Sequence, residues 1–270
     1  MGIDRDTVKY LLLDRKIDFN GLNILTIGRM RWYAGARGFR LMRRFSNTKL
    51  KSETYSEFFF QSLGAASINS MDFSSYESAT IIHNLNMPID KQFENKFDFV
   101  LDSGSLEHIF NCQEALYNYM KMCKLGGDLV LVLPTNNQLG HGLYQFSPEF
   151  FFRILSKTSG FVIKRMLLKT DGIFGGWYEL KDPLTLGARH EIRTHSRSML
   201  FIHAIKVSEF KQPINIVQSD YDSEVKPQLT KMGNFFLSAP RPIQTFLIKL
   251  IIQPRYRFRS FINLRRIRIK

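Results

Sequence analysis

Short apolar runs in the first half of the chain each stop at a small or polar residue. These runs and the residues that follow them are 23–27 and Gly28, 66–71 and Asp72, 80–82 and Asn84, 97–101 and Asp102, and 128–133 and Pro134. Apolar runs of this length, rich in β-branched residues, predict buried strands. Because connecting segments alternate with them, the pattern predicts a mostly parallel sheet whose carboxyl ends carry the site.

Apolar residues at helical spacing predict three helices. The first begins within 4–6 and presents the apolar residues of 8–12 on one face. The second spans 114–124 and is expected to end at the glycine pair 126–127. The third has Ser147 as its N-cap, with a proline in its first turn.

Two later apolar runs, 161–168 and 199–205, bring the predicted strands to seven. The span 171–198 between them contains Gly, Pro and two His and is expected to be irregular. An apolar helix is expected at 246–252, followed by a basic tail. The expected parts of the chain are a helical lead-in at 1–21, an α/β domain at 22–210 and a C-terminal extension with the basic tail at 211–270.

Composition supports a packed interior in a reducing compartment. Hydrophobic residues make up 44% of the 270 residues, which is enough for a core. The two cysteines, Cys112 and Cys123, form neither a disulfide framework nor a metal-binding spacing. No signal peptide and no run of 18 apolar residues is present, so we expect a cytoplasmic protein.

The positive charge is concentrated in two segments. The net charge is +14, yet 29–51 and 241–270 together contain 17 Lys and Arg and no acids, so the rest of the chain is close to neutral. The tail interleaves arginines with aromatic residues after an apolar run, which favours peripheral contact with the inner face of a membrane. RNA binding and a solvated tail packed on the body remain alternatives. The segment 29–51 favours an anionic acceptor.

The stretch 97–108 reads Phe-Asp-Phe-Val-Leu-Asp-Ser-Gly-Ser-Leu-Glu-His and is followed by a helix, Gly-Gly and a very apolar strand. This order resembles the class I S-adenosylmethionine-dependent methyltransferases, especially the group with Leu-Glu-His after the fourth strand, which includes quinone and glycan methylating enzymes. The resemblance covers about residues 22–165. It implies a Rossmann-like α/β fold with flanking helices, and S-adenosyl-L-methionine as cofactor.

The resemblance also implies cofactor contacts at the strand ends. Asp72 would accept hydrogen bonds from the ribose hydroxyls, and Asn84 would bond the adenine edge; the alternative for both is a role in their own turns. A turn rich in Gly and Ser after the fourth strand leaves room for the methionine part of the cofactor. The implied cofactor residues are Gly28, Asp72, Asn84, Asp102, Ser103 and Gly104.

The first glycine loop departs from the family pattern. Of the usual three glycines only Gly28 remains, because Met30 and Trp32 occupy the other two positions, and Thr26 stands where an acid often lies. Glycines permit close approach of backbone to ligand, and the acid binds the amino group of the cofactor. Either another residue such as Asp102 takes over that role, or cofactor binding is weak or lost.

Candidate catalytic residues follow the fourth and fifth strands. His108 is the expected general base, because imidazole titrates near neutrality and His108 follows the cofactor turn. Glu107 would orient it or bind acceptor hydroxyls, and His141 lies in the polar loop 136–148, where the family builds its acceptor pocket. The alternative is that Glu107 is a helix N-terminal acid, that His108 is a packed histidine and that the loop caps itself.

No metal site is expected, since methyl transfer from a sulfonium needs none. His83, His190, His195 and His203 lack metal-ligand spacing, and the aromatic run 58–60 is expected in the core.

We therefore expect a methyltransferase that acts on a small or carbohydrate-like acceptor, at oxygen, in surface polysaccharide biosynthesis. A non-catalytic binding protein with the same fold and an RNA-directed methyltransferase are the alternatives.

Overall fold

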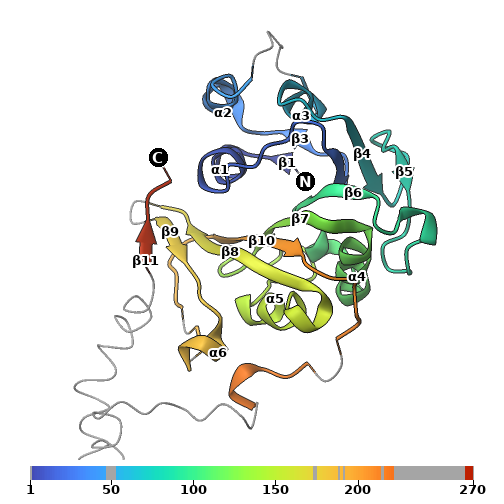
Figure 1. Cartoon of the computed structure of the whole chain (residues 1–270). Coiled ribbons are helices and arrows are strands. Elements are labelled where there is room, and N and C mark those ends of the chain that lie inside the picture. Colours follow the sequence, from blue (N-terminus) through green and yellow to red (C-terminus); the bar gives the residue numbers. More distant parts are fainter. Residues whose placement is uncertain are drawn as a thin grey trace, which may run out of the picture.

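The computed structural model describes residues 2–46, 53–172, 175–187, 189–190, 192–213, 216–221 and 265–269. Its centre is a nine-stranded sheet in the order β11-β9-β8-β10-β7-β6-β2-β4-β5 (Figure 1). The strands are β2 (Asn23–Ile27), β4 (Ser67–Asp72), β5 (Ile81–Ile82), β6 (Phe97–Ser103), β7 (Cys123–Pro134), β8 (Phe161–Thr170), β9 (Gly176–Glu179), β10 (Ser198–Lys206) and β11 (Arg265–Ile267). A separate pair joins β1 (Gly2–Ile3) to β3 (Arg31–Trp32).

Five adjacent strands, β5-β4-β2-β6-β7, are parallel, as the alternating pattern predicts. The chain builds outward from β2 to β4 and β5 on one side and then returns to β6 and β7 on the other. The strand order therefore reverses between β2 and β6. In doubly wound α/β sheets, ligands bind outside the carboxyl ends of the strands at this reversal.

The other half of the sheet is antiparallel and larger than expected. β10 lies between β7 and β8 and runs opposite to both, and these strands complete the seven predicted ones. β9 and β11 extend the edge by two more, so the expected number of seven was wrong. β9 lies within the span 171–198, which was expected to be irregular. The strand was not predicted because four residues are too few to show a clear alternation of apolar and polar positions. β11 belongs to the basic tail, which was expected to contact a membrane surface and was not expected to contain a strand.

Alternate strand residues face two separate cores. On one face, Leu129, Leu131 and Leu133 of β7 pack with α4 (Cys112–Met122) and α5 (Pro148–Ile154). On the other, Val130 and Val132 pack with the N-terminal helices. These helices are α1 (Arg5–Lys9), α2 (Gly35–Met42) and α3 (Glu57–Ser62), and Figure 1 places them together on that face. The sheet is thus covered on both sides, as its continuous apolar strands require.

The predicted helices are confirmed with small changes at their ends. Asp4 caps α1, which continues as a π-helical turn over Tyr10–Asp14, and Ser147 caps α5. The helix expected at 114–124 runs from Cys112 to Met122 and passes directly into β7, so the glycine pair 126–127 lies in the strand and does not end the helix. A Cβ at Gly127 would come within 2.9 Å of the Asp98 carbonyl oxygen, so glycine allows β7 to approach β6 there.

The lead-in packs against the body of the sheet. Val8 and Leu11 are fully buried with Phe99 and Phe201, and the aromatic run 58–60 lies in the same core, as expected. A short helix α6 (Pro183–Leu186) lies in the connection between β9 and β10. In the described part of the chain, no helix combines the length and apolarity needed to cross a membrane. The helix expected at 246–252 and most of the basic tail lie outside the described residues.

Candidate active site

A cavity of about 280 Å³ lies at the carboxyl ends of the parallel strands. Gly28 follows β2, Asp72 ends β4, Asn84 follows β5, and Ser105 and His108 follow β6; all five line this cavity. The position is the strand-order reversal, and the volume is near the lower limit of about 300–1,000 Å³ for small-molecule sites. A larger hollow of about 660 Å³ is lined by residues that precede β2 and β4, such as Phe19 and Leu63, together with Arg268 and Ile269 after β11, so it lies away from the carboxyl ends of β2 and β4.

The turn after β2 is closed by its own hydrogen bonds. Gly28 has φ of 75°, which favours glycine, and its N–H donates to the Met71 carbonyl at 2.6 Å. The Thr26 hydroxyl donates to the Gly28 carbonyl at 2.9 Å. Thr26 is therefore a structural part of this turn, at the position where the family often has an acid.

The other two glycine positions of the family loop hold core side chains. Met30 is buried, and the Trp32 ring packs on Phe58 with 4.9 Å between ring centroids. The chain here enters β3 and pairs with β1. Close approach of this loop to a ligand is consequently limited to Gly28.

Asp72 and Asn84 both line the cavity, although they are 12 positions apart in the sequence. The Asp72 carbonyl accepts a hydrogen bond from the His83 N–H at 2.9 Å, which holds the ends of β4 and β5 together. The Asp72 carboxylate makes a long contact of 3.4 Å with the Ser74 N–H. The Asn84 side-chain oxygen accepts from the Asn86 N–H at 3.1 Å.

The turn after β6 is organised around Asp102, which is fully buried. Its carboxylate accepts from the N–H groups of Ser105 and Leu106 at 2.8 and 2.9 Å and from the Tyr119 hydroxyl at 3.1 Å. Burial, together with the nearby Glu107, raises the pKa of Asp102 to about 7. Asp102 therefore shapes the turn from within, and Gly104 supplies the positive φ of 91° that the turn requires.

Two serines of this turn connect it to other elements. The Ser103 hydroxyl donates to the Gly2 carbonyl at 2.8 Å, which directs it toward β1. The Ser105 hydroxyl donates to the Ile27 carbonyl at 2.8 Å and joins the ends of β6 and β2 beside the cavity.

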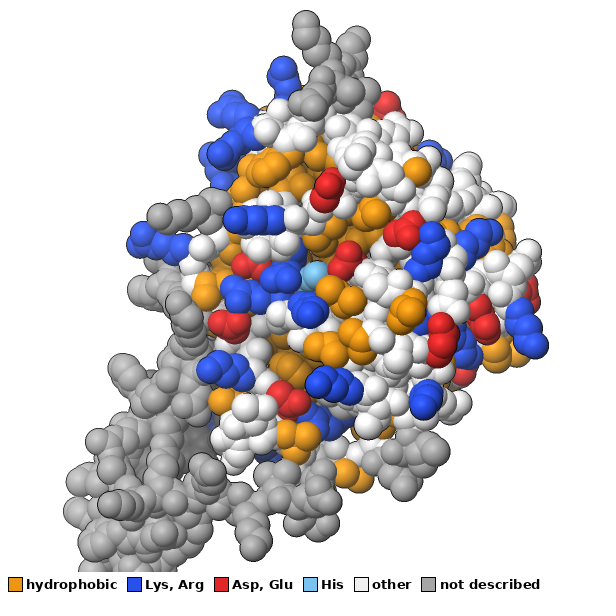
Figure 2. All heavy atoms as spheres, in the orientation of Figure 1, with side chains coloured by type: hydrophobic (Ala, Val, Ile, Leu, Met, Phe, Trp, Pro, Cys, Tyr) orange, Lys and Arg blue, Asp and Glu red, His pale blue; other side chains and the backbone are white. Residues whose placement is uncertain are grey.

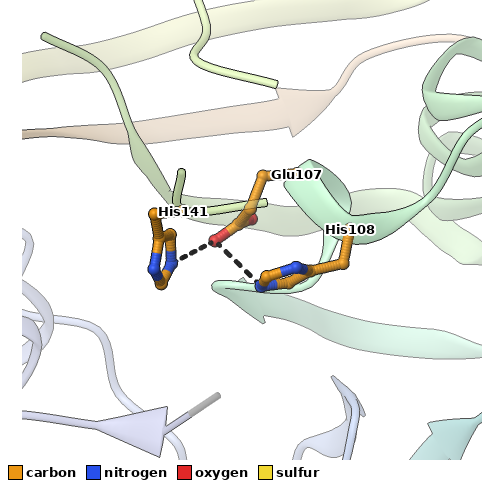
Figure 3. Close-up of side chains that lie close together, drawn as sticks. All are labelled: Glu107, His108 and His141. Atoms are coloured by element: carbon orange, nitrogen blue, oxygen red, sulfur yellow. Dashed lines mark ion pairs between the residues drawn. The ribbon is translucent and has the colours of Figure 1, made fainter. Parts of the chain in front are cut away.

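Glu107, His108 and His141 form one cluster next to the cavity (Figure 3). Glu107 and His108 belong to the 3-10 turn Leu106–His108, whereas His141 comes from the loop after β7. Both histidines point their Nε2 atoms toward Oε1 of Glu107, at 3.9 Å from His108 and 3.5 Å from His141. Burial raises the pKa of Glu107 to about 7, and burial together with His141 lowers the pKa of His108.

The structure divides the site residues predicted from the sequence into three groups. Gly28, Asp72, Asn84 and His108 line the cavity. The side chains of Asp102, Ser103 and Glu107 are buried, and Gly104 and the exposed His141 do not line the cavity. Ser105, the last residue of the Gly- and Ser-rich turn expected beside the cofactor, also lines the cavity. His83 was expected only as a structural histidine, and its position next to Asn84 was the available signal for its place in the cavity.

Part of the basic segment 29–51 is neutralised by acids from elsewhere. Arg29 Nε lies 2.6 Å from Glu57 and Arg31 lies 2.9 Å from Glu77, and Arg29 also stacks over Tyr55 at 4.0 Å. Arg37 and Arg40 on α2 are exposed. Figure 2 shows Lys and Arg side chains gathered at the place that α2 occupies in Figure 1.

Comparison with known proteins gives weak similarities in structure alone. No family model and no curated protein matches the sequence. Solved structures with a similar arrangement include an S-adenosylmethionine-dependent methyltransferase from Mesorhizobium loti, with 12% identity over 73% of this chain and 97% of that chain and a TM-score of 0.42. Another is 1,6-didemethyltoxoflavin-N1-methyltransferase from Burkholderia thailandensis, with 12% identity, 76% and 78% coverage and a TM-score of 0.43.

A third similar structure has a different chemistry. It is the branched-chain polyamine synthase from Thermus thermophilus, with 11% identity, 77% and 57% coverage and a TM-score of 0.40. A fold does not determine a function, so the function of this chain is argued from its own site.

Proposed function

We propose that the protein is an S-adenosyl-L-methionine-dependent methyltransferase. The observation that carries the proposal is the cavity at the strand-order reversal, where a carboxylate, an amide and a positive-φ glycine stand at three successive strand ends. A carboxylate accepts both hydroxyls of a ribose, and an amide can both donate to and accept from an adenine edge. His108 stands at the same cavity, on the turn after β6.

The residues present fit the adenosine part of the cofactor better than its methionine part. Asp72 would hold the ribose, Asn84 the adenine and Gly28 the adjoining backbone contact. Asp102 would not contact the cofactor directly, because its oxygens already accept three hydrogen bonds; it would fix the conformation of the turn that does. Ser103 would contribute backbone only, since its hydroxyl bonds Gly2, while Gly104 leaves space beside the methionine part.

The bound cofactor would supply a methyl group already activated by its sulfonium sulfur. The task left to the chain is to place the acceptor and remove its proton. His108 is the proposed general base, since it lies on the cavity and its imidazole is half exposed to an incoming acceptor. Glu107 and His141 would set its orientation.

The proposed acceptor is a small or carbohydrate-like molecule that is methylated at oxygen. The loop 136–148 supports this, because its exposed segment carries His141 beside the apolar side chains Leu139 and Leu143, a mixture suited to the polar and apolar faces of a sugar. A role in surface polysaccharide biosynthesis, in the cytoplasm at the inner face of a membrane, remains part of this proposal.

A non-catalytic binding protein is the second candidate. The packing of Met30 and Trp32 into the core favours it, because a loop without its glycines offers less backbone to a cofactor. If the protein fails to bind S-adenosylmethionine, this second candidate is favoured over the methyltransferase.

The experiment compares the affinity of the full-length protein and of Asp72→Ala for S-adenosylhomocysteine by calorimetry. Loss of hydrogen bonds to a charged group costs about 1.5–3 kcal/mol, so affinity should fall by about one to two decades. Asp90→Ala removes an exposed carboxylate away from the cavity and should leave the affinity unchanged. Equal affinities of Asp72→Ala and the wild type would refute the assignment of Asp72.

A further inference from the structure

The Glu107 carboxylate is fully buried without a hydrogen bond. Its side chain is 0% exposed, and neither oxygen has a hydrogen-bond partner among the described residues. A buried ionised carboxylate without compensation is costly, so proteins neutralise it, pair it or place it on a metal ion.

The two neighbouring histidines lie too far from Glu107 for direct hydrogen bonds but close enough to share an ion with it. The Nε2 atoms of His108 and His141 lie 3.9 and 3.5 Å from Glu107 Oε1, beyond the usual N–H···O range of about 2.7–3.2 Å. Two ligand atoms of a tetrahedral zinc ion with bonds of about 2.0–2.2 Å lie about 3.3–3.6 Å apart, a range that the His141 distance matches and the His108 distance slightly exceeds. The candidate ligand atoms of all three residues lie within 4.8 Å of one another.

We propose that Glu107, His108 and His141 bind one divalent transition-metal ion of the zinc type. Two imidazoles and one carboxylate form a ligand set typical of zinc and other first-row metals, whereas Mg²⁺ and Ca²⁺ prefer oxygen ligands alone. The spacing was invisible in the sequence, because His141 comes from a different loop, 33 positions after His108.

The surroundings of the cluster favour an open rather than a closed metal site. The carboxylate lies inside, while the His108 and His141 side chains are 51% and 55% exposed (Figure 3). Three protein ligands with solvent on one side leave a coordination position free, which is the arrangement of catalytic rather than structural zinc. His108 also lines the proposed cofactor cavity, so the free position would lie beside the methyl donor.

The consequence for catalysis rests on the proposed function. A hydroxyl of the acceptor bound at the free position would have a lowered pKa, because the ion stabilises the oxyanion. Its proton would leave to solvent, and the new carbon–oxygen bond would form as the carbon–sulfur bond of the donor breaks. His108 would then serve as a metal ligand, and the ion would take over the activation of the acceptor from the proposed base.

The test uses the full-length protein, stripped with a chelator and titrated with Zn²⁺ and with Co²⁺, whose visible absorption reports nitrogen and oxygen ligands. The expected result is one ion per chain, with weaker affinity for Mg²⁺. Glu107→Gln and His141→Ala should each lower the Zn²⁺ affinity by more than about tenfold. His195→Ala removes an exposed histidine outside the cluster and should bind Zn²⁺ as the wild type does.

Thermal unfolding of each stripped variant checks that it is folded before titration. Zn²⁺ and Co²⁺ affinities that are absent in the wild type, or unchanged in both folded cluster variants, would overturn the proposal. Because metal binding is measured without cofactor, the two proposals fail separately. Zinc binding without any binding of S-adenosylhomocysteine would retain the metal site and reject the methyltransferase, and the reverse result would reject the metal site alone.

Discussion

Gly142 is the residue at which the loop 136–148 lies against Glu107. Its φ is +74°, and a Cβ there would meet the carbonyl oxygen and Cγ of Glu107 at 2.8 and 2.9 Å. The N–H groups of Leu143 and Tyr144 also donate to the Glu107 carbonyl, at 2.7 and 3.2 Å. The backbone around Gly142 therefore fixes the position of His141 relative to Glu107.

Gly142→Ala and Gly140→Ala form a matched pair that tests this contact. Gly140 has a similar φ of +83° but nothing within 4 Å of an added Cβ, so its alanine variant should lose only the backbone term of about 1–2 kcal/mol. Gly142→Ala should lose about 1–3 kcal/mol more, because the methyl group overlaps Glu107. Urea unfolding measures both, and equal losses would contradict the contact.

The position of a single residue in the fold could be predicted from the sequence where neighbouring residues determine it. Asp72 and Asn84 were placed by their positions after apolar runs, and the structure brings both to one cavity. The burial of Asp102 could not be predicted, because Tyr119, which donates its third hydrogen bond, lies 17 positions later on α4. The same limit applies to Glu107 and His141, whose proximity depends on the loop after β7.

At the scale of elements, α4 supports the turn after β6 through the Tyr119 hydroxyl and through apolar packing on Leu106. Tyr119 on α4 is fully buried and donates to Asp102, the carboxylate around which the turn is built. Tyr119→Phe keeps the ring and removes this bond. At pH 8, above the pKa of about 7 of Asp102, the acceptor is mostly ionised, and loss of a hydrogen bond to a charged acceptor costs about 1.5–3 kcal/mol of unfolding free energy.

Tyr117→Phe is the control for this prediction. Its hydroxyl lies on the same helix and accepts from the Gln113 amide at 2.8 Å, so only a neutral bond of about 0.5–1.5 kcal/mol is lost. Denaturant unfolding should rank Tyr119→Phe below Tyr117→Phe in stability. The reverse order would show that α4 does not support the turn in this way.

The helices and strands were predicted correctly where the pattern of apolar positions extended over enough residues. The parallel strands, α4 and α5 were predicted because apolar runs and N-caps such as Ser147 act locally. β9 has four residues and β11 three, and both are stabilised by pairing at the sheet edge, to which a local pattern is insensitive.

At the scale of the whole molecule, one sheet covered on both faces places a cavity at its strand-order reversal, and the basic segment 29–51 begins directly after Gly28 of that cavity. Arg37 and Arg40 on α2 are exposed, and the basic residues of 241–264 lie outside the described residues. Contact of the tail with an anionic membrane surface therefore stays a prediction from the sequence, as does the alternative of RNA binding.

The central claim is that the cavity between β2 and β6 binds S-adenosylmethionine. Calorimetric titration of the full-length protein with S-adenosylmethionine and with S-adenosylhomocysteine tests it most directly. The account predicts binding of one molecule per chain for both compounds, weakened in Asp72→Ala. Absence of binding for both compounds up to about 1 mM, which corresponds to less than about 4.1 kcal/mol of binding free energy, would contradict it.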